Sequence, residues 1–158
     1  MGYALQSLLK IRAMREDRAA GELAAARSRA EIARRELAER EADLAEYEKT
    51  KEERRDRIFD SVIGRPVQRE QIDIAREGVA RIDEEGILKA DNVKRAEENL
   101  AKRDAETECA KTAFYTAARN RMKIGEHRSF WEEEQKKEQE YIAEAELEDF
   151  TGRKKDDD

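Results

Sequence analysis

The stretch DSVIGRPVQ, residues 60–68, contains the only proline in a chain of 158 residues. Proline has no amide donor and clashes with the preceding turn, so Pro66 cannot continue a helix. It also moves Arg65 out of the helical region, and Gly64 is a typical turn residue. We therefore expect one helix to end before this stretch, which we call the tip, and another to begin after it.

The composition is that of long helices. Charged residues make up 46% of the chain and aromatic residues 6%, and the commonest residue types are good helix formers. Low hydrophobicity is also typical of disorder, but the apolar residues recur with a period near 3.5, as they do in coiled coils. The periodicity favours a coiled coil over disorder.

Heptads run on both sides of the tip. With Leu23 as position a, eleven of sixteen a and d positions between Leu5 and Ile58 are apolar. With Ile72 as position a, eleven of sixteen are apolar again as far as Ile124. Two seams (the a and d positions) of equal length around one breaker predict a self-paired hairpin, although pairing between molecules would give the same pattern.

The predicted fold class is therefore all-α, with two long helices forming an antiparallel coiled-coil hairpin. Helix 1 is expected over residues 3–59, the tip over 60–68 and helix 2 over 69–149. A single domain is expected over residues 1–150, followed by a disordered tail over 151–158. Gly78 and Gly86 lie inside helix 2 and disfavour it, so we expect a kink or a loosened turn near residues 84–92.

Folding the chain at the tip pairs positions whose numbers sum to roughly 130. Leu9 is then expected near Arg121, and helix 2 should overhang the N-terminus beyond Gly125. The overhang contains the only tryptophan of the chain. Tryptophan and tyrosine are common interface anchors, so we interpret this end as partner-binding; the alternative is a frayed helix whose aromatic residues have no role. The candidate residues at this end are Tyr3, Leu8, Leu9, Ile11, Met14, Phe130, Trp131 and Tyr141.

The tip carries apolar residues at a place where exposure is expected. Phe59, Val62, Ile63 and Pro66 form this second candidate set. Two interpretations are open: these side chains cap the end of the seam, or they contact a partner.

Several classes of function are disfavoured. The 33 basic and 39 acidic residues are mixed, whereas nucleic-acid binding favours a basic stripe. A two-helix protein offers no catalytic cleft, so we predict neither an enzyme nor a cofactor. His127 has no metal-ligand partners at suitable spacing, and Cys109 is the single cysteine. No stretch approaches the ~20 apolar residues of a membrane span, and we expect a cytoplasmic protein.

The chain resembles the FliJ/YscO family of type III secretion stalk proteins. The likeness lies in YALQSLLKIR (residues 3–12), EDRAA (residues 16–20) and EQKKEQEY (residues 134–141), together with the length and the hairpin layout. The resemblance implies a non-enzymatic central stalk whose terminal end enters and stimulates a hexameric export ATPase. It also implies contact with the cytoplasmic domain of the export gate at the inner membrane and, in some members, with secretion chaperones. The alternative is a generic coiled-coil scaffold or adaptor that dimerises or bridges other proteins.

Overall fold

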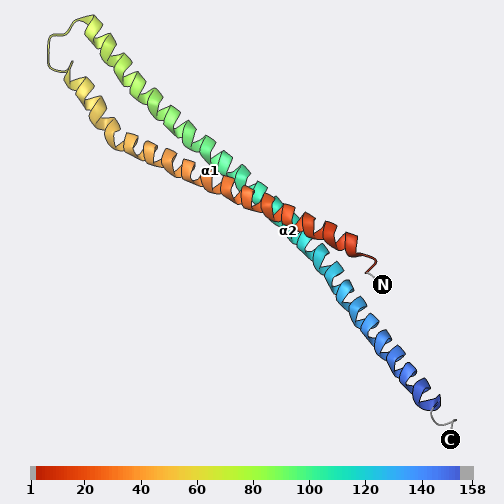
Figure 1. The fold of residues 1–158 in the computed structure, drawn as a ribbon. Helices are drawn as coiled ribbons and strands as arrows, with labels where there is room; N and C mark the ends of the chain where they lie inside the picture. Colours follow the sequence, from red (N-terminus) through yellow and green to blue (C-terminus); the bar gives the residue numbers. More distant parts are fainter. Residues whose placement is uncertain (1–2, 154–158) are drawn as a thin grey trace. The chain divides into compact units, whose positions relative to one another are not determined.

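The computed structural model describes residues 3–153, and the side chains of residues 3–148. Helix α1 spans Gln6–Asp60 and helix α2 spans Arg69–Arg153, with no strand among the described residues (Figure 1). The predicted all-α hairpin is confirmed. Helix α2 continues four residues beyond its expected end at residue 149, so the expected tail overlaps it at residues 151–153. Residues 154–158 of that tail lie outside the described residues.

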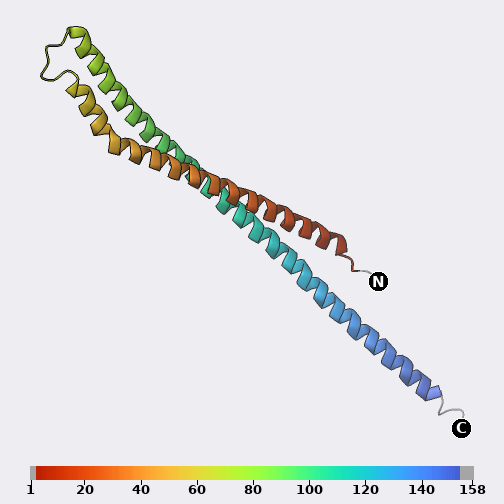
Figure 2. The same cartoon turned by 60° about the vertical axis from the view of Figure 1, so that its left-hand side comes forward.

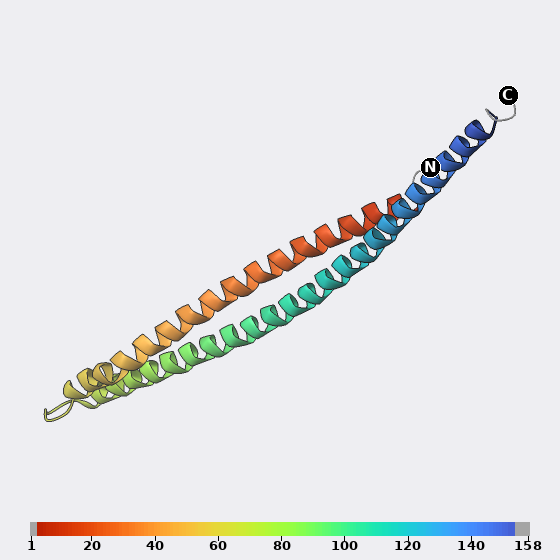
Figure 3. The same ribbon diagram turned by 90° about the horizontal axis from the view of Figure 1, so that it is seen from below.

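Contacts group the chain into two units. The terminal unit comprises Met1–Leu23 and Ala110–Asp158, and the tip unit comprises Ala24–Cys109. In the tip unit the two helical segments run side by side from the connecting loop (Figure 3). The units are described separately below, and a single domain over residues 1–150 stays a prediction.

The turn of the tip unit follows from its local chemistry. The amide of Val62 donates to the carbonyl of Phe59 at 3.0 Å as α1 ends, and Gly64 has a φ of 74°, a left-handed value that favours glycine. Gln68 then caps the start of α2, because its amide donates to the side-chain oxygen of Gln71 at 3.0 Å. Gln71 is the third residue of α2, and its side chain accepts a hydrogen bond from the amide of the residue before the helix. This bond is one half of a capping box.

The core is the thin seam that the heptads predict. Every buried residue occupies a predicted a or d position, and none of the described polar or charged side chains is buried. Most of the buried residues are alanines, which allow two helices to approach closely but bury little apolar area. The buried residues are Ala19, Leu23, Ala26, Ala30, Ala33, Tyr47, Ile82 and Ala96.

The largest buried side chain occupies the space that a glycine leaves. The Tyr47 hydroxyl donates a hydrogen bond to the carbonyl of Ile82. A Cβ atom added to Gly86 would lie 2.8 Å from the Tyr47 hydroxyl oxygen, so only glycine admits the ring there. Helix α2 is continuous through residues 84–92, so the expected loosened turn is wrong, and Tyr47 packs against Gly86 there. The alternative expectation, a kink, stays a prediction.

Ion pairs flank this seam position. Arg54 donates to Glu85 at 2.7 Å, and Arg55 donates to Asp83 at 3.2 Å. The Arg54 hydrogen bond is the main cause that lowers the pKa of the Glu85 carboxyl. These pairs are partly exposed, so each contributes little to stability, but together they fix which turns of α1 and α2 face each other.

Candidate functional site

The terminal unit holds an aromatic cluster where the chain enters α1. Tyr3 precedes the helix, and its carbonyl accepts the amide of Gln6 at 3.1 Å. The Tyr3 hydroxyl is hydrogen-bonded to His127 Nδ1 at 2.9 Å. Its ring centroid lies 5.5 Å from that of Trp131, within the range of favourable aromatic pairs. Tyr3 therefore ties the start of α1 to α2.

This contact moves the point at which α2 begins to overhang the start of the chain that the structure describes. We expected the overhang to begin directly after Gly125, yet the N-terminal segment reaches Trp131. Residues 3–5 are not helical, and a non-helical chain advances farther per residue than the 1.5 Å of a helix. The part of α2 that extends past Tyr3 begins after Trp131 instead, and Figure 2 shows α2 continuing past the start of α1. We call residues 132–148 the extension.

The structure gathers some candidate residues and separates others. Tyr3 and Trp131 touch, while Leu8 and Leu9 are half-buried. The exposed candidates are Ile11, Met14, Phe130 and Tyr141, of which Phe130 is 61% exposed. Tyr141 lies in the extension, ten residues beyond Trp131, and is not brought into the aromatic cluster.

An open groove of about 460 Å³ lies between the helices of the terminal unit. Leu9 and Arg121 both line it, as the predicted pairing requires, and Gly125 leaves space beside them. Arg121 donates to Glu16 at 2.7 Å, and this hydrogen bond raises the pKa of Arg121. Two charged seam residues thus pair with each other at positions where a coiled coil normally buries apolar side chains.

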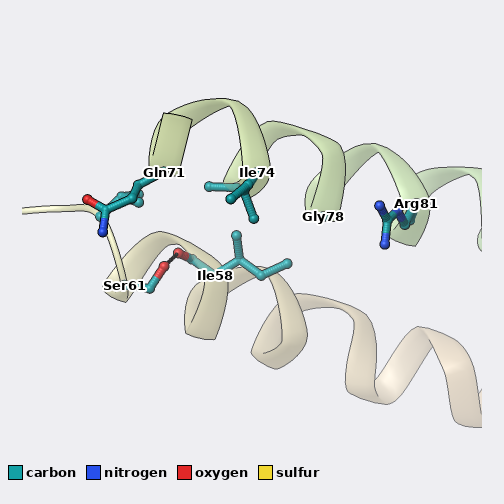
Figure 4. Close-up of a pocket in the computed structure, with 8 residues that line it drawn as sticks. Ile58, Ser61, Gln71, Ile74, Gly78 and Arg81 are labelled. Carbon is teal, nitrogen blue, oxygen red and sulfur yellow. Dashed lines mark hydrogen bonds between the residues drawn. The ribbon is translucent and has the colours of Figure 1, made fainter. Parts of the chain in front are cut away.

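The second candidate set lies at the turn of the tip unit. Ile63 is 67% exposed, Phe59 and Pro66 are also exposed, and Val62 is half-buried. Val62 lines two grooves, of about 400 Å³ and 270 Å³. Figure 4 shows the larger one, where Ile58 points toward Gly78 of α2. The tip therefore presents apolar side chains beside two shallow grooves.

A comparison with protein families identifies the chain. The model of the type III secretion protein YscO matches residues 5–153, which include the whole of α1 and α2. The chain belongs to the YscO family of type III secretion proteins. The resemblance noted in the sequence is thus confirmed for YscO. Neither the curated proteins nor the solved structures give a match.

Neither a metal cluster nor a membrane-spanning helix is present in the part of this YscO family member that the structure describes. Within residues 3–148, no group of three or more His, Cys, Asp or Glu residues is placed to hold a metal ion. None of the described helices is long and apolar enough to cross a membrane.

Sequence reasoning missed the role of His127, which it treated only as a failed metal ligand. The numbers of Tyr3 and His127 sum to 130, so the pairing rule itself could have placed them together. The Glu16–Arg121 pair was also missed, although both residues are charged and occupy a positions of the heptads. Applying the pairing rule to polar residues would have found the Tyr3–His127 contact, but the Glu16–Arg121 pair departs from that rule by seven residues, one heptad.

Proposed function

We propose that this YscO family member is a non-enzymatic stalk protein of a type III export apparatus. It binds the hexameric export ATPase through its terminal unit and stimulates ATP hydrolysis. The tip contacts the cytoplasmic domain of the export gate, and secretion chaperones are further partners. The protein acts on the cytoplasmic side of the inner membrane.

The observation that carries this proposal is the apolar surface of the terminal unit. Tyr3 and Trp131 hold the start of α1 against α2, while Ile11, Met14 and Phe130 of the same unit are exposed. A helix pair that buries mostly alanine yet exposes its larger apolar residues favours contact with another protein. Membership of a secretion family indicates a component of the export machinery.

The tip is the second contact in this proposal. Phe59 and Ile63 are exposed next to the grooves that Val62 lines, which supports the partner interpretation over a closed cap. Two contact surfaces in different units give the protein a means of connecting two partners. Its mixed surface charges form weak, exchangeable contacts of about 0–1 kcal/mol each, which suit a part that moves within a ring.

An ATPase assay tests the proposal. The variant Ile11→Ser, Met14→Ser, Phe130→Ser changes three exposed side chains without touching the aromatic cluster. We expect it to leave the export ATPase of the same secretion system at its unstimulated rate. A matched control, Ile87→Ser with Leu88→Ser, removes exposed apolar residues of the tip unit and should stimulate like the wild type.

Helicity by circular dichroism must be equal in all three proteins for this comparison. Equal stimulation by the wild type and the terminal variant would refute the assignment of the ATPase contact. Light scattering separates the alternative function, because a generic dimeric scaffold would give a stable dimer, whereas the proposed stalk is a monomer.

A further inference from the structure

The negative charge of this chain is concentrated in the extension. Residues 132–148 contain eight glutamates and two lysines, a net charge of −6, which equals the net charge of the whole chain. Residues 1–131 contain 28 basic and 27 acidic residues and are close to neutral. The apparent mixing of charges along the chain therefore hides one strongly acidic helical segment.

The extension is open to solvent. Every residue from Lys136 to Glu148 is exposed. Ion pairs in this segment, such as Lys136–Glu140 at 3.8 Å, join residues of α2 to each other. Glu133, Glu134, Glu144 and Glu146 form no ion pair with any other described residue. Their charges are consequently free to act on a partner.

One face of this acidic helix also carries apolar anchors. Phe130 and Tyr141 are eleven residues apart, as are Trp131 and Ile142, and eleven residues make about three turns, so each pair shares one side of α2. Tyr141 is 73% exposed and Ile142 is 50% exposed. The side that Trp131 presents to Tyr3 in the aromatic cluster thus continues, uncovered, into the extension.

Charge decides which kind of partner covers this face. Nucleic acid and anionic lipid would be repelled by a net charge of −6, and so would the extension of a second copy. A groove with basic side chains at its rim and an apolar floor complements both features, as when an amphipathic helix docks into a protein groove. The rim charges then set the association rate and its salt dependence.

We propose that the extension is a docking helix for a basic, apolar-floored groove on a protein partner. This inference rests on the proposed function, since the export ATPase is the partner that meets the terminal unit. Tyr141 and Ile142 enter the groove, and the glutamates meet basic residues at its rim. The extension is thus a second contact, additional to the exposed residues of the paired helices.

Titration calorimetry with the purified export ATPase tests the inference on the full chain. Neutralising Glu133, Glu134, Glu144 and Glu146 to glutamine should weaken binding about tenfold at low salt and reduce its salt dependence. The matched control neutralises four exposed α1 glutamates of the tip unit and should bind like the wild type. The control substitutions are Glu36→Gln, Glu39→Gln, Glu41→Gln and Glu48→Gln.

A second pair of variants tests the contact of the two apolar side chains of the extension with the floor of the partner's groove. Tyr141→Ala with Ile142→Ala should weaken binding about tenfold or more, because tyrosines that become buried at an interface are frequent hot spots. Ile87→Ala with Leu88→Ala is the control and should leave the affinity unchanged. Circular dichroism of each variant checks that the helices remain intact.

The outcomes separate the two proposals. Equal ATPase affinity for the wild type and both extension variants would overturn the docking helix and leave the proposed function standing. No ATPase binding by the wild type would overturn the proposed function together with this inference. Sedimentation that shows a wild-type dimer, lost in the extension variants, would identify a second copy as the occupant and also overturn the inference.

Discussion

Replacing Gly86 by alanine probes the tightest packing in the tip unit. Alanine is normally the better helix former, by about 1 kcal/mol relative to glycine. At this position, however, the new Cβ would lie 2.8 Å from the Tyr47 hydroxyl oxygen and 2.9 Å from its Cε1 atom. Tyr47 is only 5% exposed, so its ring cannot swing freely into solvent without unpacking the seam.

The magnitude follows from three contributions. Overpacking costs about 1–3 kcal/mol, and loss of the Tyr47 hydrogen bond to Ile82 costs about 1 kcal/mol more. The gain in helix propensity offsets about 1 kcal/mol. We therefore expect Gly86→Ala to lower the free energy of unfolding by roughly 1–3 kcal/mol.

Urea unfolding followed by circular dichroism measures this change. Gly21→Ala is the reference for propensity, because a Cβ there meets nothing within 4 Å, and it should stabilise the protein. In a Tyr47→Ala background the clash disappears, so Gly86→Ala should become neutral or stabilising. The reasoning is refuted if Gly86→Ala stabilises the wild type as much as Gly21→Ala does.

Three further predictions concern other parts of the chain. Tyr3→Ala should shift the fluorescence of Trp131, the only tryptophan, to longer wavelength because the ring loses its cover; an unchanged spectrum would contradict the Tyr3 contact. The Arg54 hydrogen bond lowers the pKa of Glu85 from its ordinary value of 4.5, so its stabilising effect is present above that pH and is lost as pH falls through the lower folded-state pKa. Glu85→Gln should therefore flatten the acid limb of a stability–pH curve, and an unaltered limb would argue against the pair. Gly64→Ala should destabilise the tip unit by about 1–2 kcal/mol, as measured by urea unfolding, because alanine disfavours a positive φ; no loss would show that the turn adapts.

Most of the fold could be predicted from the period of the apolar residues. Leu23, Tyr47 and Ile82 were placed in the seam by heptads alone, and all three are buried. Pro66 and Gly64 correctly marked the turn, because a proline that cannot continue a helix is a local constraint. These features depend on residues close together in the sequence, which is why no structure was needed to find them.

Features that depend on pairing across the hairpin were harder to predict. Gly86 was expected to loosen α2, since helix propensity says nothing about a ring arriving from the other helix. The reach of Tyr3 to Trp131 was missed because the first residues were assumed to be helical. The acidity of the extension was visible in the sequence, but the charge balance of the whole chain concealed it.

The central claim is that the terminal unit is the part of this protein that meets the export ATPase. An electron cryo-microscopy structure of the protein bound to its ATPase hexamer tests the claim most directly. We expect density for α1 from Gln6 and for α2 near Phe130 within the ring. Density for the tip, residues 60–68, in the ring instead would contradict it.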